Sequence, residues 1–148
     1  MRNLLLFVIG MSLFSMQAFA DQKCKSVNLK VKNELEAEGQ KRKIKVNAIY
    51  YWDNEDKKWR FENVRDKEIS NNKSHTFTES LEYVGNEKVN AFYVKFQYLA
   101  GGKWSKTRYS KHLKKNGDTV YGKTECVKNK TYKLTINNAQ EKEPTDNP

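Results

Sequence analysis

The stretch that decides the fold runs from residue 92 to residue 108 and reads FYVKFQYLAGGKWSKTR. Apolar side chains recur at every second position in its first half, which is the period of a strand with one buried face. The buried face is predicted to carry Phe92, Val94, Phe96 and Tyr98. Gly101-Gly102 supplies the backbone freedom of a tight turn, and the alternation resumes at Trp104. This stretch therefore predicts a β-hairpin.

The same alternation continues on both sides of this hairpin. Further strands are expected at 27–31, 44–52, 59–61, 77–83, 119–121, 123–127 and 132–136. Turn-forming residues separate them at 53–56, 71–73, 85–88, 114–118 and 128–130. Roughly seven to nine short strands favour an all-β fold, a two-sheet antiparallel β-sandwich, for which an immunoglobulin-like architecture is one form. A small β-barrel is the alternative.

The segment 44–52 makes a specific prediction about burial. Strict alternation gives it a buried face made of Ile44, Val46, Ala48, Tyr50 and Trp52. Tyr51 lies between two of these positions and is therefore expected to point outward.

The first twenty residues have the features of a secretory signal peptide. Arg2 supplies a positive charge, residues 4–14 are mostly apolar, and Ala18-Phe19-Ala20 precedes the expected cut. The apolar run is too short for a membrane span, which needs about 20 residues. We therefore predict a signal peptide at 1–20, a single β domain at 21–137 with no transmembrane segment, and a secreted or periplasmic location. Residues 138–148 contain both prolines and no aromatic or branched aliphatic side chain, which predicts a disordered tail.

The two cysteines of the chain, Cys24 and Cys126, are predicted to form one disulfide, because an exported protein meets an oxidising compartment. The bond would join the two ends of the domain. Closing a loop of about 100 residues contributes ~4 to 5 kcal/mol in the chain-entropy picture.

Lysine and arginine outnumber aspartate and glutamate by 28 to 18. Such an excess attracts polyanions and keeps a protein in solution. Export removes the chain from nucleic acid, which is not an expected partner. The expected partners are an acidic glycan, an envelope glycolipid or an acidic protein. The alternative is a lysine-rich surface that serves solubility alone. The sequence does not specify an oligomeric state.

One strand combines basic and aromatic side chains on its outward positions. If Phe92 and its alternating partners face the core, Tyr93, Lys95 and Gln97 face outward. The following segment adds positive charge near them. The predicted binding residues are Tyr93, Lys95, Gln97, Lys106, Arg108 and Lys111. Exposed tyrosines stack on sugars or fill protein pockets, and cations hold carboxylates, sulfates or phosphates. The alternative is that Trp104 belongs to the core and the lysines protect exposed strands from aggregation.

Catalysis, metals and cofactors have little support in the sequence. There is no G-x-S-x-G, HExxH or CxxC motif, and the only histidines are His75 and His112. An EF-hand reading of Asp53-Asn54-Glu55-Asp56 fails because Lys58 and Val64 occupy the positions of the required glycine and glutamate. We therefore predict no catalytic residue, no metal and no cofactor.

Two other functions are left open. One is a small secreted enzyme or toxin whose site forms only in the fold, with His75 and His112 as the first residues to test. The other is an interaction protein that accepts a partner strand at an exposed sheet edge.

Overall fold

The computed structural model describes residues 26–53, 56–81, 88–89, 91–111, 114–115, 118–119, 124–125 and 131–144. Every secondary-structure element in this part is a strand. The predicted signal peptide, Cys24, Cys126 and His112 lie outside the described residues. The described part contains no helix long and apolar enough to cross a bilayer.

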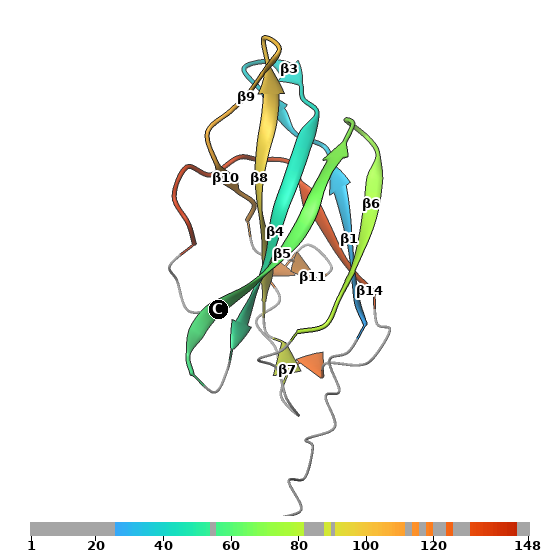
Figure 1. Ribbon diagram of the computed structural model, residues 1–148, viewed down its shortest axis with the longest axis vertical. Helices are drawn as coiled ribbons and strands as arrows, with labels where there is room; N and C mark the ends of the chain where they lie inside the picture. Colours follow the sequence, from blue (N-terminus) through green and yellow to red (C-terminus); the bar gives the residue numbers. More distant parts are fainter. Residues whose placement is uncertain are drawn as a thin grey trace, which may run out of the picture.

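Two sheets make up most of the domain. The three-stranded sheet has the order β14 (Thr131–Ile136), β1 (Val27–Asn33) and β6 (Ser74–Glu79). The five-stranded sheet has the order β10 (Arg108–Tyr109), β8 (Phe92–Ala100), β4 (Ile44–Asp53) and β5 (Lys58–Ile69), and β9 (Lys103–Trp104) pairs with β8. Figure 1 shows the two sheets alongside each other, with β6 and β1 on the right of the view.

Three short ribbons complete the described strands. They pair β2 (Glu36–Ala37) with β3 (Gln40–Lys41), β7 (Lys88–Val89) with β13 (Thr124–Glu125), and β11 (Lys114–Lys115) with β12 (Asp118–Thr119). The all-β prediction is confirmed. None of the described sheets closes into a barrel, so the barrel alternative has no support.

The core lies where the two sheets present apolar side chains to each other. From the three-stranded sheet it contains Val27, Leu29, Val31, Phe77, Tyr132, Leu134 and Ile136. From the five-stranded sheet it contains Ile44, Val46, Ile49, Tyr51, Val64, Ile69, Phe92, Val94 and Phe96. Alternation along each strand produces this arrangement, because it turns every second side chain to the same side.

The predicted turns at 71–73 and at Gly101-Gly102 are confirmed. Residues 54–55, 85–87, 116–117 and 128–130 of the other predicted turns lie outside the described residues, and Lys114–Lys115 and Asp118–Thr119 are strands. Asp53 pairs with Lys58 at the closed end of the β4–β5 hairpin. Gly101 and Gly102 both have positive φ and join β8 to β9. Asn72, with φ of 61°, lies in the turn before β6. That turn carries the chain from one sheet to the other, because β6 pairs with β1 of the three-stranded sheet.

One pairing differs from the antiparallel prediction. β1 and β14 run parallel, with Leu29 opposite Tyr132 and Val31 opposite Leu134. All other described strand pairs are antiparallel. Parallel neighbours need a long connection, and the whole domain lies between these two strands. Local sequence patterns give no information about such a pairing.

Ala48, Tyr50 and Trp52 of β4 are buried as predicted, but the predicted sides of the sheet are wrong beyond Val46. Val46 lies opposite Phe96 and Ala48 lies opposite Lys95, so β4 has one extra residue, Asn47, against β8. This bulge reverses the faces of the residues that follow it, because side chains alternate with a period of two. Tyr51 therefore enters the shared core and is fully buried, whereas the predicted core residue Tyr50 lies on the opposite side of the sheet.

Candidate functional site

The outer face of the five-stranded sheet, which points away from the shared core, gathers aromatic side chains from four segments. Tyr50 on β4 lies opposite Phe61 on β5 and opposite Tyr93 on β8. Tyr109 on β10 lies next to them, and Trp59 of β5 packs against the same group. We call Tyr50, Trp59, Phe61, Tyr93 and Tyr109 the aromatic cluster. Residues directly opposite each other in a sheet project to the same side, which is why these rings meet.

The rings of the aromatic cluster are tightly packed. Tyr50 stacks on Tyr93 with ring centroids 4.5 Å apart. Trp59 meets Tyr93 edge-on at 4.6 Å, and Tyr109 approaches Tyr50 edge-on at 6.3 Å. Phe61, 5.4 Å from Tyr50, keeps 50% of its surface exposed and is the only exposed large hydrophobic residue in the described part. The aromatic cluster is thus a second, smaller core on the outer face of the sheet, and Phe61 is its solvent-exposed member.

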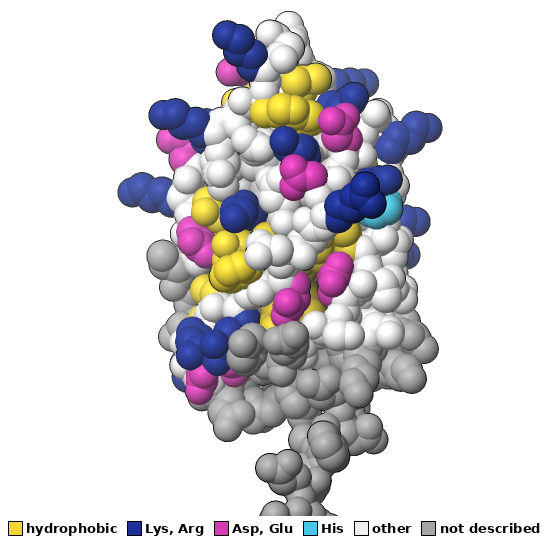
Figure 2. Space-filling model, viewed as in Figure 1, with side chains coloured by type: hydrophobic (Ala, Val, Ile, Leu, Met, Phe, Trp, Pro, Cys, Tyr) yellow, Lys and Arg dark blue, Asp and Glu magenta, His cyan; other side chains and the backbone are white. Residues whose placement is uncertain are grey.

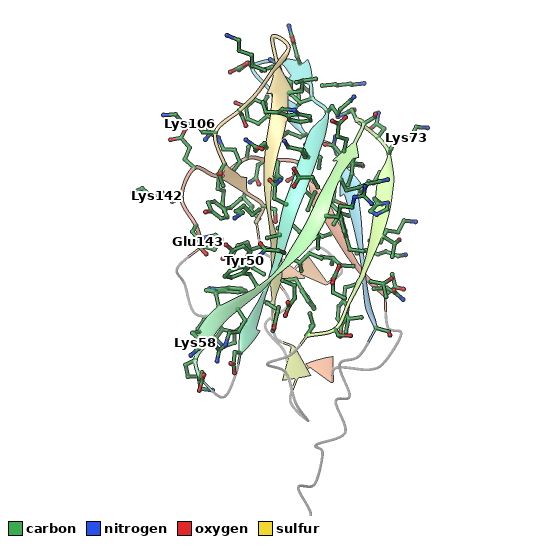
Figure 3. All side chains as sticks on the ribbon, viewed as in Figure 1. Tyr50, Lys58, Lys73, Lys106, Lys142 and Glu143 are labelled. Atoms are coloured by element: carbon green, nitrogen blue, oxygen red, sulfur yellow. The ribbon has the colours of Figure 1, made fainter. Side chains whose placement is uncertain are left out.

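A segment from the C-terminal end covers this cluster. We call residues 138–144 the strap. Gln140 of the strap and Tyr109 exchange two backbone hydrogen bonds, each 2.9 Å long. Arg108 Nη2 lies 3.1 Å from Glu141 Oε1, and the Tyr93 hydroxyl donates a 2.8 Å hydrogen bond to Glu143 Oε1. Figure 3 shows Glu143 close to Tyr50, with Lys142 and Lys106 along the same edge of the molecule.

The strap lies in the segment 138–148, which the sequence predicts to be a disordered tail, and the structure describes it as far as residue 144. Composition predicts disorder because the segment has no aromatic or branched aliphatic side chain to bury. In the structure Ala139 packs against the shared core, and the backbone and carboxylates of the strap find partners on β10 and β8. The boundaries of the domain remain a prediction.

The phenol groups of the aromatic cluster stay protonated over a wide pH range. Burial raises the pKa of Tyr50 to about 12, and the Glu143 carboxylate adds to this. Burial, followed by the hydrogen bond to Glu143, raises the pKa of Tyr93 strongly. Burial and Glu143 also raise the pKa of Tyr109. Near neutral pH the cluster therefore offers neutral hydroxyl donors to a carboxylate.

The three predicted binding residues on β8 face outward as expected. Of these three, only Lys95 is both partly exposed and outside the hydrogen bonds described here. Tyr93 is fully buried, because the strap and the neighbouring rings cover it. The Gln97 amide donates a 2.7 Å hydrogen bond to the Ser105 carbonyl. Lys95 is half-buried opposite Tyr109. The expected exposure of Tyr93 is therefore wrong.

The three predicted residues around β10 do not share one face. Arg108 lies opposite Phe96, a core residue, so it faces the inner side of the sheet, with its guanidinium 6.0 Å from the Tyr98 ring. Lys106 and Lys111 are exposed on either side of β10. The structure brings Lys106, Arg108 and Lys111 to one sheet edge, beside the strap.

Charges on this outer face are partly neutralised. Lys43 pairs with Glu68 and Lys45 pairs with Asp66. Lys45 also lies 4.7 Å from the centre of the half-buried Trp104 ring. Within the described ranges, no ion pair involves Lys95, Lys106 or Lys111. Figure 2 shows hydrophobic patches on this side of the molecule, interrupted by side chains of both charges.

The outer face of the three-stranded sheet has a different character. Its residues, read from the register, are Asn28, Lys30, Lys32, Ser74, Thr76, Thr78, Thr131, Lys133 and Thr135. None of these is acidic, although Lys32 reaches Glu34 just beyond β1. This face is a second basic surface, which the sequence analysis did not single out.

No metal centre forms within the part of the chain that is described, where no three His, Cys, Asp or Glu side chains gather. The Asp53 carboxylate accepts hydrogen bonds from Arg60 and from the Asp56 backbone. Asp56 pairs with Lys58, which lowers the pKa of Asp56, and also with Arg60. These two carboxylates stabilise the hairpin turn.

His75 lies on β6 against the ring of Phe77, with centroids 4.8 Å apart. Burial, and then the positive charge of Lys67, lowers the pKa of His75. The lowered pKa favours the neutral imidazole, whose ring packs edge-on against Phe77.

Sequence reasoning missed Phe61, Trp59 and Tyr109 as parts of a common cluster, and Glu143 as its partner. A sequence signal existed for Phe61 and Trp59, since both alternate on one strand, but the bulge concealed that Tyr50 shares their face. Comparison with family models, with curated proteins and with solved structures finds no match to this chain.

Proposed function

We propose that this protein is an exported, non-catalytic binding module that captures an anionic partner at the β10 edge of its five-stranded sheet, beside the strap. The observation that carries the proposal is that this surface already holds two carboxylates. Arg108 binds Glu141 and Tyr93 binds Glu143. A cation and a neutral phenol that hold carboxylates within the chain have the chemistry to hold those of a partner.

Three lysines extend this surface. Lys95, Lys106 and Lys111 surround β10 and make no ion pair with any described residue. Such charges are expected to speed association with a polyanion and to make it sensitive to salt. The chemistry admits an acidic glycan, an envelope glycolipid or an acidic protein.

We also propose that the domain is a two-sheet sandwich of immunoglobulin-like architecture. The chain is exported to the periplasm or out of the cell. Two sheets that share one apolar core support the sandwich. The proposed mature chain begins at Asp21 and carries a disulfide between Cys24 and Cys126. Intact mass of the exported protein, before and after reduction and alkylation, tests both: a mass that includes residues 1–20, or free thiols, would contradict them.

The binding proposal is tested by amide NMR titration of the oxidised mature protein. The probes are polygalacturonate, phosphatidylglycerol vesicles and polyglutamate, each at low salt and at about 0.15 M salt. The test variant is Lys95→Glu/Lys106→Glu. The matched control is Lys30→Glu/Lys133→Glu, which changes the net charge equally on the outer face of the other sheet.

We expect at least one probe to give saturable shifts around β10, with affinity about tenfold lower in the test variant and nearly unchanged in the control. Loss of affinity only in the control would move the site to the three-stranded sheet. No binding of any probe would overturn the proposed function.

A further inference from the structure

The strap is a short acidic peptide bound to the domain by contacts that a separate chain could also make. Its backbone pairs with Tyr109 through two hydrogen bonds, as an added strand does. Its two carboxylates reach Arg108 and Tyr93, which are fixed on β10 and β8. None of these contacts requires that the peptide belong to the same polypeptide.

Ala139 at the start of the strap packs against the shared core, whereas the carboxylates further along it lie at the surface. The side chain of Glu141 is 80% exposed, and Lys142 and Glu143 are exposed as residues. The pairing with β10 is a single bridge rather than a ladder. In the ion pair of Arg108 with Glu141 the carboxylate is the exposed member, since the Arg108 side chain is only 17% exposed, and solvent screens the Glu141 side of the contact. A partner segment of similar chemistry can therefore compete with the strap.

The contacts also discriminate between classes of anionic partner. The bridge at Tyr109 needs an N–H and a C=O at the spacing of an extended peptide, which a glycan or a lipid headgroup does not offer. Both of those partners could reach only Arg108 and the lysines. β10 is the last strand of its sheet, so only the strap covers its outer edge in the described part.

We propose that the β10 edge is a docking site for an extended acidic segment of a partner protein, which replaces the strap, pairs with Tyr109 and presents carboxylates to Arg108 and Tyr93. This inference rests on the proposed function and names its partner class. The strap then acts as an internal competitor, and only chains with a displaced strap are competent to bind.

The test uses the full mature chain and a synthetic peptide with the sequence of residues 137–144, NNAQEKEP. The variant Glu141→Gln/Glu143→Gln removes both carboxylates of the strap and so weakens the binding of the strap to the β10 edge. The matched control is Glu36→Gln/Glu68→Gln, with the same change of charge at two exposed positions away from β10. A second peptide, NNAQQKQP, lacks the two carboxylates.

We expect the strap variant to bind NNAQEKEP about tenfold more tightly than the unmodified chain and the control, with the largest shifts at Arg108, Tyr109 and Ser110. The carboxylate-free peptide should bind at least tenfold more weakly, and Arg108→Ala should abolish the gain. Equal affinity of NNAQEKEP for all three chains, or shifts remote from β10, would overturn the docking site. If polygalacturonate or the vesicles bind while the peptide does not, this inference fails and the proposed function stands.

Discussion

The Tyr93 hydroxyl donates a 2.8 Å hydrogen bond to the carboxylate of Glu143, fifty residues further along the chain. The pair joins the centre of the five-stranded sheet to the strap. It also accounts for a phenol hydroxyl within a fully buried side chain, since a buried polar group needs a partner.

Replacement of Tyr93 by phenylalanine isolates the contribution of this bond. The ring stays in its packed position, so the free energy of unfolding should fall by about 1 kcal/mol, the usual net value of one hydrogen bond. Urea unfolding measures the change. Tyr98→Phe is the control, because Tyr98 is only partly buried and loss of its hydroxyl should change stability less. Equal losses in the two variants would mean that the Glu143 contact does not stabilise the fold.

The Tyr50 phenol should make the fold sensitive to alkaline pH. Its pKa rises from 10.0 to about 12 in the folded protein, first through burial and then through Glu143. The folded state therefore keeps the proton when the unfolded state loses it, so stability is complete below pH 10.0 and falls as the pH rises to about 12. Phenolate absorbance during alkaline titration reports this pKa. Glu143→Gln should lower it only in part, and a full return to 10.0 would show that burial is not the main cause.

The bulge in β4 predicts a large effect at a position that simple alternation places outside. Tyr51 is fully buried in the shared core, and its hydroxyl donates to Glu62 at 2.8 Å. Tyr51→Ala should cost about 3 to 5 kcal/mol, as for other large aromatic residues in cores. Phe61→Ala, at a half-exposed ring, should cost about 1 kcal/mol or less. Chemical denaturation compares them, and a small loss at Tyr51 would contradict the bulged register.

These residues also define how far the sequence could predict the fold. Alternation around Phe92 and turn chemistry at Gly101-Gly102 are local, and both led to the correct hairpin. The extra residue Asn47 is also local, but nothing in the sequence distinguishes a bulge from an unbroken strand. The parallel pairing of β1 with β14 and the contact of Glu143 with Tyr93 join distant segments. Only the assembled sheets determine such contacts, so the aromatic cluster and its strap could not be read from spacing.

Asn33 should be one of the least replaceable polar residues. Its side chain is buried and donates two 2.8 Å hydrogen bonds, to the carbonyl oxygens of Arg42 and Ile69, while its Oδ1 accepts from the backbone of Leu35 at 3.0 Å. These bonds join the end of β1 to the segment before β4 and to the end of β5. Asn33→Ala leaves buried backbone groups without partners and should cost about 3 kcal/mol or more. Thermal and urea unfolding provide the measurement, with exposed Asn137→Ala as the control, and similar losses in both would contradict this role.

Two lysine side chains repel each other on the outer face of the three-stranded sheet, and one substitution can remove this repulsion. Lys30 lies directly opposite Lys133, and like charges in facing positions destabilise a sheet. Lys133→Glu replaces repulsion by attraction and should raise the free energy of unfolding by about 1 kcal/mol at low salt.

The gain from Lys133→Glu should shrink as salt screens the pair. Lys73→Glu, in the exposed turn before β6, changes the net charge equally without a facing lysine and is the control. If both variants gain equally, the benefit comes from the lower net charge of a chain with 28 basic and 18 acidic residues. If only Lys133→Glu gains, the two lysines repel each other in the native sheet. A polyanion that bound this face would relieve the same repulsion, so the stabilisation in Lys133→Glu measures how much free energy such binding could recover.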